Sequence, residues 1–107
     1  MVQEIELFQF EQLLKQQGNH AVMCYTPFCG TCKVALRMLE VVGHLHSSMS
    51  MHRLNVNLHP KWCEAWEIRS VPCLLIFQDG QLLTKEYAVR SVDYLHQLFN
   101  DITGKTH

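Results

Sequence analysis

The chain has 107 residues, of which 48% are hydrophobic and 18% charged, and its formal net charge is −1 with neutral histidines. This length suits a single domain, residues 1–107, and is enough to bury a core without disulfide staples. The balanced charge excludes the electrostatic signature of a nucleic-acid or membrane-surface protein. The first residues do not look like a secretory signal, and no apolar run is long enough to cross a bilayer.

The first half of the chain predicts two strands and two helices. Residues 2–6 could form a short edge strand, and apolar residues at helical spacing from Phe8 predict a helix that ends at Gly18. Residues 20–25 are apolar without helical period, which indicates a buried strand. The next helix should begin near Cys29 or Gly30. Its expected core face consists of apolar residues three or four apart, namely Val34, Met38, Val41, Val42 and Leu45.

The second half predicts three strands and two helices. Residues 51–58 alternate, with Leu54, Val56 and Leu58 on one face, and a helix should follow from Pro60 to about residue 68. Residues 71–77 are the most strand-like segment, and Asp79-Gly80 predicts a hairpin to a return strand at 81–87. A final helix should follow a Ser91 cap. The order βαβαβαββα predicts an α/β fold with a mixed sheet of four to five strands and helices on both faces.

Cys29 and Cys32 stand where the predicted strand at 20–25 gives way to a helix. The first turn of a helix presents unpaired backbone N–H groups and the positive end of the helix dipole. Both favour an anion, so this position favours the thiolate of Cys29, which is the nucleophilic form of cysteine. Cys32 lies one turn further on, close enough to form a disulfide with Cys29. The pattern predicts thiol–disulfide exchange.

Two other interpretations of this cysteine pair remain open. The pair could be half of a zinc site, but structural zinc uses four ligands and no second Cys-x-x-Cys is present. The seven histidines are scattered without metal spacing, so we expect no metal. Alternatively, the fold could serve binding alone.

Taken together, these motifs resemble the thioredoxin family over nearly the whole chain. Cys29-Gly30-Thr31-Cys32 follows a strand and opens a helix, and Val71-Pro72 precedes an apolar strand about 40 residues later. Asp79-Gly80 then turns into the last strand before a C-terminal helix. The resemblance implies a thioredoxin-like fold and a thiol–disulfide oxidoreductase that reduces disulfides in partner proteins.

The resemblance also implies roles for individual residues. Cys29 would be the attacking cysteine, Cys32 the resolving cysteine, and Pro72 a cis-proline beside them. Val71 would offer its backbone to a bound substrate strand, a form of β-augmentation. The apolar surface around the cysteines would consist of Phe28, Gly30, Val71, Pro72 and Ala88.

Cofactor, partners and compartment follow from the same resemblance and from composition. No cofactor would be bound, and an external NADPH-dependent reductase or a low-molecular-weight thiol would restore the Cys29/Cys32 dithiol. The partners would be disulfide-containing proteins, and we expect a monomer. Five cysteines are an odd number without the dense pairing of small secreted scaffolds, so we expect a reducing cytoplasm.

Several positions depart from the family pattern. Phe28 stands where thioredoxins have Trp, and Thr31 where they have Pro. Met23 stands where they carry a buried Asp credited with assisting proton transfer at the second cysteine. Losing such help should slow the attack by Cys32, since general acid–base catalysis contributes about 10²–10⁴-fold in rate. This departure favours, as the alternative function, a non-catalytic adaptor or a thiol redox sensor.

The other three cysteines each have a functional and a structural interpretation. Cys73 follows Pro72, so it could be an accessory redox thiol near the active-site loop. Free cysteine is also a compact buried hydrophobe, and we favour a core position for both Cys73 and Cys24. For Cys63 we favour an ordinary helix position.

Overall fold

The computed structural model describes residues 1–87 and 89–104. In these residues the predicted order βαβαβαββα is confirmed, including the short first strand. The strands are β1 (Val2–Ile5), β2 (Asn19–Tyr25), β3 (Met49–Asn55), β4 (Cys73–Gln78) and β5 (Gln81–Glu86). The helices are α1 (Leu7–Leu13), α2 (Gly30–Gly43), α3 (Pro60–Ala65) and α4 (Val92–Thr103).

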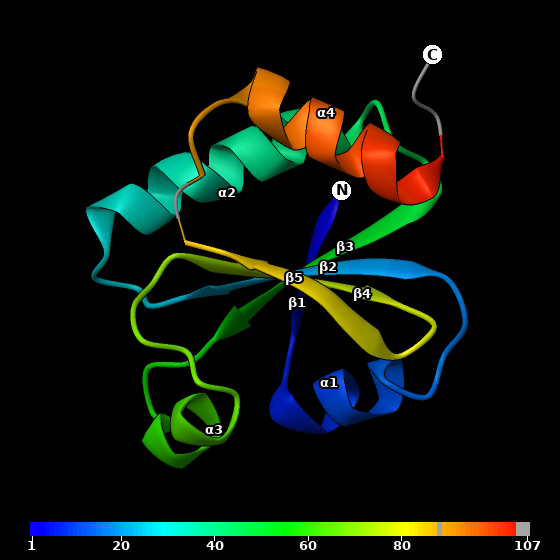
Figure 1. The fold of residues 1–107 in the computed structure, drawn as a ribbon. Helices are drawn as coiled ribbons and strands as arrows, with labels where there is room; N and C mark the ends of the chain where they lie inside the picture. The colour runs from blue at the N-terminus through cyan, green and yellow to red at the C-terminus, as the bar shows by residue number, and fades with distance from the viewer. Residues whose placement is uncertain (88, 105–107) are drawn as a thin grey trace.

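Within the described residues, the five strands form one mixed sheet in the order β1-β3-β2-β4-β5 (Figure 1). β1 and β2 both run parallel to β3, whereas β4 runs antiparallel to β2 and to β5. The carboxyl ends of β2 and β3 and the amino end of β4 therefore meet at one end of the sheet. The loops at 26–29, 56–59 and 66–72 lie at this end. We call it the cysteine end, because the first of these loops contains Cys29.

Helices cover both faces of the sheet, as predicted. Figure 1 shows α2 and α4 on one face and α1 and α3 on the other. The core under α2 and α4 consists of Ala21, Met23, Ala35, Leu39, Val42, Met49, Met51, Leu74, Ile76, Leu95 and Phe99. The core under α1 and α3 consists of Ile5, Phe10, Leu13, Val22, Cys24, Leu54, Val56, Cys73, Leu75 and Phe77. Because successive strand residues point to opposite faces, Met23 and Cys24 lie in different cores.

The β4–β5 hairpin forms at Asp79-Gly80, as predicted. Both residues have positive φ, 51° and 82°, which is the backbone conformation that type I′ hairpin turns require. The Asp79 carboxylate also accepts a hydrogen bond from the Gly18 backbone N–H at 2.7 Å. A Cβ at Gly80 would collide with the carbonyl oxygen of Leu14, so this turn packs too closely for another residue.

Several details of the sequence prediction were wrong. The first helix ends at Leu13, before Gly18, and the helix from Pro60 ends at Ala65, before residue 68. In α2 the buried residues are Cys32, Ala35, Leu39 and Val42, while Val41 is 51% exposed and Leu45 60% exposed. In β3 the strand ends at Asn55, whose side-chain oxygen accepts the Asn57 backbone N–H at 2.9 Å. That turn breaks the alternation, so Leu58 is 82% exposed instead of facing the core with Leu54 and Val56.

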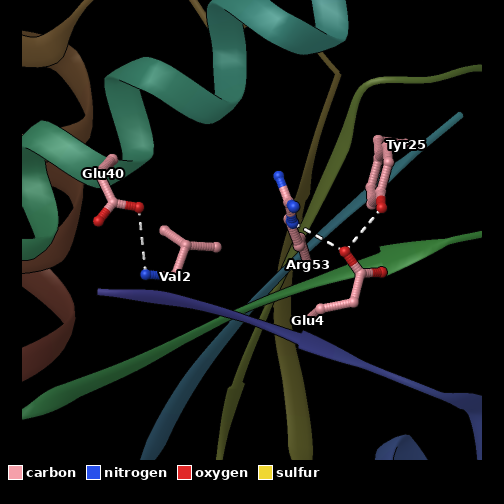
Figure 2. Close-up of polar contacts among 5 residues, drawn as sticks. All are labelled: Val2, Glu4, Tyr25, Glu40 and Arg53. Carbon is pink, nitrogen blue, oxygen red and sulfur yellow. Dashed lines mark hydrogen bonds and ion pairs between the residues drawn. The ribbon is translucent and has the colours of Figure 1, made fainter. Parts of the chain in front are cut away.

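Polar contacts hold the edge strand β1 in place (Figure 2). The Val2 backbone N–H donates to the Glu40 carboxylate of α2 at 3.2 Å. One carboxylate oxygen of Glu4 accepts from the Tyr25 hydroxyl at 2.7 Å and from Arg53 Nε at 2.8 Å. These contacts join β1 to β2, β3 and α2, which explains why so short a strand pairs along its whole length with β3.

Candidate active site

The Cys29–Cys32 pair lies at the start of α2, directly after the loop that follows β2. Cys29 is the N-cap residue of α2, with an extended backbone (φ −107°, ψ 109°). Its sulfur accepts a hydrogen bond from the Cys32 backbone N–H at 3.1 Å, in the way that an N-cap side chain satisfies a free donor of the first turn. The two residues are joined by a disulfide, with Cα atoms 5.2 Å apart. This structure is therefore the oxidised form of the pair.

The two sulfurs of the pair differ in access to solvent. Cys29 is partly exposed, whereas Cys32 is only 1% exposed and belongs to the buried face of α2. The Thr31 hydroxyl lies 3.3 Å from the Cys29 sulfur, so it can donate to that sulfur together with the Cys32 N–H. Donors directed at a sulfur favour its thiolate form.

Val71 and Pro72 approach the cysteine pair from the amino end of β4. The Val71–Pro72 peptide bond is cis, as the family resemblance implied. The Val71 carbonyl oxygen lies 3.9 Å from the Cys29 sulfur. Both residues are partly exposed, so a segment docked on Cys29 would meet the backbone of Val71.

A groove of about 380 Å³ lies beside the cysteine pair. It is lined by Thr31, Val34, Ala35, Pro72, Tyr87 and Val89. Phe28 is 88% exposed immediately before Cys29. Gly30 is exposed, and a Cβ there would meet no atom within 4 Å. The cysteines thus lie next to an apolar surface that side chains of another molecule could occupy.

Most residues proposed from sequence gather at this end of the sheet. Ala88 lies outside the described residues. Cys73 follows Pro72 in the chain, yet its side chain is fully buried in the core on the other face, under α1 and α3. Burial raises the pKa of the Cys73 thiol to about 11, while Lys85 and a hydrogen bond with Tyr87 act in the opposite direction.

Five lining residues were not among the site residues proposed from sequence, namely Thr31, Val34, Ala35, Tyr87 and Val89. Tyr87 and Val89 follow β5, and Val34 is an exposed residue of α2. Val34 was assigned to the core by its helical spacing, and its 46% exposure shows that it faces out. No sequence motif marks Tyr87 or Val89. Their placement depends on the β4–β5 hairpin bringing the end of β5 next to α2.

A metal-binding cluster and a membrane-spanning helix are two further features that could indicate a function. Among residues 1–87 and 89–104, no group of three or more His, Cys, Asp or Glu side chains could hold a metal ion. No helix in those residues is both long and apolar enough to cross a membrane. The disulfide-forming pair is therefore the centre on which a function can be argued.

Comparison with known proteins agrees with this geometry. The family model described as Thioredoxin matches residues 1–101. The thioredoxin-like protein YusE of Bacillus subtilis is 45% identical over 74 residues, which cover 69% of this chain and 70% of that protein. A thioredoxin of Chlamydia caviae is 29% identical over 76 residues, covering 71% of this chain and 74% of the relative.

Solved structures show the same fold. Thioredoxin from Trypanosoma brucei brucei superposes with a TM-score of 0.85 at 16% identity, covering 97% of this chain and 92% of that one. Oxidised mitochondrial thioredoxin 3 from Saccharomyces cerevisiae gives 0.81 at 22% identity and covers 94% of each chain. With the family match, the fold and the disulfide-forming Cys29–Cys32 pair in agreement, this chain belongs to the thioredoxin family and is a thiol–disulfide oxidoreductase.

Proposed function

We propose that Cys29 is the nucleophile and Cys32 the resolving cysteine of a protein-disulfide reductase. The observation that carries this assignment is the contrast between the partly exposed Cys29 sulfur, which has two donors beside it, and the buried Cys32. An exposed thiolate can reach a partner, whereas a buried thiol can reach only Cys29. Electrostatic stabilisation at the helix N-terminus supports the same assignment.

The reaction then proceeds in two exchanges. The Cys29 thiolate attacks one sulfur of the partner's disulfide, a mixed disulfide forms, and the partner's other sulfur leaves as a thiolate. The Cys32 thiolate then attacks the Cys29 sulfur and releases the second partner thiolate. Two electrons pass from the dithiol to the partner, and the chain is left in the oxidised form seen here.

We propose that partner segments dock on Phe28, Gly30, Val71, Pro72 and Ala88. For the four of these residues that the structure describes, the support is exposure beside the Cys29 sulfur and the nearness of the Val71 carbonyl. An extended segment could hydrogen-bond with the Val71 backbone as an added strand. The apolar groove beside it suits side chains that flank the disulfide.

Thioredoxins carry no prosthetic group, and we propose that an external NADPH-dependent reductase or a low-molecular-weight thiol returns the dithiol here. We further propose that residues 1–107 act as one monomeric domain in a reducing cytoplasm. The odd number of cysteines, five, without the dense pairing of small secreted scaffolds, supports that compartment. Analytical ultracentrifugation of the reduced protein tests whether it is a monomer.

The decisive experiment is a redox titration in graded dithiol buffers, with the Cys29–Cys32 bond followed by mass spectrometry. A reversible bond with a potential near that of thioredoxin, about −270 mV, is expected of a reductase. A potential toward about −120 mV would indicate an oxidant and contradict the proposed direction.

Two variants test the roles of the cysteines. Cys29→Ser should abolish insulin reduction, and Cys32→Ser should accumulate a mixed disulfide through Cys29. Turnover that persists in Cys29→Ser would show that the nucleophile has been wrongly assigned.

A further inference from the structure

Residues 67–70, between α3 and the cis-proline, have little apolar burial to hold them, whereas Trp66 and Val71 on either side pack partly against the core under α1 and α3. Glu67, Arg69 and Ser70 are exposed, and only Ile68 packs partly against the core under α1 and α3. Glu67 also has φ 54°, in the left-handed region that costs a non-glycine residue about 1–2 kcal/mol. Besides the backbone hydrogen bond from Ile68 N–H to the Cys63 carbonyl at 2.8 Å, polar contacts with other elements therefore help to set the shape of residues 67–70.

Two residues at the end of the β4–β5 hairpin supply those contacts. Lys85 Nζ donates to the carbonyl oxygens of Trp66 at 2.8 Å and Glu67 at 2.9 Å. The Tyr87 hydroxyl donates to the same Glu67 carbonyl at 3.0 Å and accepts from the Arg69 backbone N–H at 3.1 Å. The Glu67 carbonyl thus receives two donors, which fixes the peptide at the residue with the strained backbone.

These contacts also match the electrostatics of the segment. The Trp66 and Glu67 carbonyls lie at the carboxyl end of α3, where the helix dipole favours a cation, and Lys85 places its ammonium there. Hydrogen bonds from a charged donor are stronger than those between neutral groups. The Arg69 guanidinium lies 5.8 Å from the centre of the Tyr87 ring, a cation–π distance that adds a further contact.

The same segment leads directly to the cysteine pair. Val71 follows two residues after Arg69, and its carbonyl oxygen lies 3.9 Å from the Cys29 sulfur. The Tyr87 side chain itself lines the groove beside Thr31 and Pro72. Tyr87 therefore contacts both regions: its hydroxyl hydrogen-bonds with the backbone of Glu67 and Arg69, and its side chain lines the groove.

We propose that Lys85 and Tyr87 are positioning residues, which hold residues 66–71 so that the Val71 backbone is presented beside Cys29 to an extended partner segment. This inference rests on the proposed function, in which Val71 binds the partner. Neither residue takes part in the sulfur chemistry. They act by removing alternative conformations of the segment before a partner arrives, which lowers the free-energy cost of docking.

The test compares Tyr87→Phe and Lys85→Met with a matched control, Tyr94→Phe. Tyr87→Phe keeps the ring and removes only the hydroxyl, and Lys85→Met keeps the apolar stem and removes the ammonium. Tyr94→Phe also removes a tyrosine hydroxyl bonded to β5, since Tyr94 donates to Glu86 at 2.6 Å, but it touches nothing in residues 66–71. Lys85→Arg retains a cation and serves as the conservative variant.

Two substrates separate positioning from chemistry. Insulin presents chain on both sides of its disulfides, whereas hydroxyethyl disulfide has no chain to lie along Val71. Tyr87→Phe and Lys85→Met should each raise the KM for insulin about threefold to tenfold, the range expected for one or two lost hydrogen bonds. For Lys85→Met, whose residue does not line the groove, the kcat for insulin and the rate with hydroxyethyl disulfide should stay within about twofold of wild type. Tyr94→Phe should change neither the KM for insulin nor the rate with hydroxyethyl disulfide. The KM of Lys85→Arg for insulin should lie close to that of wild type.

Amide hydrogen exchange across residues 67–71 gives a readout that needs no turnover. Exchange should be faster in Tyr87→Phe and Lys85→Met than in wild type and Tyr94→Phe, at a temperature where melting curves show all four folded. Unchanged exchange, or an equal loss of rate with both substrates, would overturn the positioning role. A wild-type protein that reduces neither substrate, together with faster exchange in the two variants, would contradict the proposed function and leave the anchoring of the segment intact.

Discussion

Replacing Met23 with Asp tests whether the lack of a proton acceptor at this position limits the rate at which Cys32 attacks the mixed disulfide. Met23 is fully buried in the core under α2, the helix whose first turn holds the buried Cys32. Burial should raise the pKa of the new carboxyl from about 3.9 to about 7.5, within the range seen for buried acids. At pH 7 the carboxyl would be ionised in the unfolded chain and mostly protonated in the folded one. This difference corresponds to about three pKa units and lowers the free energy of unfolding by about 4 kcal/mol.

The pH dependence of that penalty has a definite sign. Below about pH 4 the carboxyl is protonated in both states, so ionisation costs nothing. As the pH rises towards about 7.5, only the unfolded chain loses the proton, and the free energy of unfolding falls. Urea titrations at pH 4 and pH 7 measure this difference. Met23→Asn is the control, because it has the same size and polarity without an ionisable group.

The functional consequence concerns the second exchange. In thioredoxins the Asp at this position is credited with assisting proton transfer at the second cysteine. If the carboxyl of Met23→Asp does the same here, release of a peptide from a mixed disulfide on Cys29 should become faster. The gain should approach the lower end of the about 10²–10⁴-fold that general acid–base catalysis contributes. Stopped-flow fluorescence of a labelled peptide measures the release. Equal rates in folded Met23→Asp and Met23→Asn would refute the idea that proton transfer limits this step.

Three further predictions follow from single contacts. Thr31→Val removes the hydroxyl 3.3 Å from the Cys29 sulfur, so alkylation of reduced Cys29 by iodoacetamide at pH 7 should slow severalfold, and an unchanged rate would dismiss that donor. Burial lowers the pKa of His52 from 6.5 to about 4, so the free energy of unfolding should fall as the pH drops through that interval, and His52→Gln should flatten this part of the urea-stability profile. Gly80→Ala forces a Cβ onto the Leu14 carbonyl at positive φ, so it should destabilise the chain by about 2 kcal/mol or more, and a melting temperature like that of wild type would contradict the packing of this turn.

The parts of the fold that the sequence predicted well are those set by local chemistry. Asp79-Gly80 makes a turn from its own backbone preferences, and Ser91 caps α4 by accepting the Tyr94 backbone N–H at 3.0 Å. The parts predicted wrongly depend on contacts beyond the local pattern. Leu58 continues the alternation of Leu54, but an asparagine turn ends β3 first and leaves Leu58 exposed. Periodicity describes a strand only as far as its hydrogen bonds to a neighbouring strand extend.

The candidate site shows the same division. The start of α2 at the Cys29–Cys32 pair follows from residues within one turn of each other, and the sequence predicted it correctly. Tyr87 has its partners 20 and 18 residues earlier, at the Glu67 carbonyl and the Arg69 N–H. Both partners are backbone atoms, which every residue has, so no residue type at those positions could reveal the contact. Only the pairing of β4 with β5 brings them together.

The cysteines illustrate how the fold gives the proposed nucleophile, Cys29, surroundings that differ from those of other thiols in the chain. Cys24 and Cys73 lie opposite each other on β2 and β4, fully buried, and burial raises the pKa of Cys24 far above its ordinary value and that of Cys73 to about 11. At neutral pH about one Cys73 in 10⁴ would then be a thiolate, and exchange requires the thiolate. Cys29 instead is partly exposed, and its sulfur lies at a helix N-terminus with two donors beside it. Cys73 can therefore adjoin the active-site proline without competing for the disulfide, because its side chain and that of Pro72 face opposite sides of the sheet.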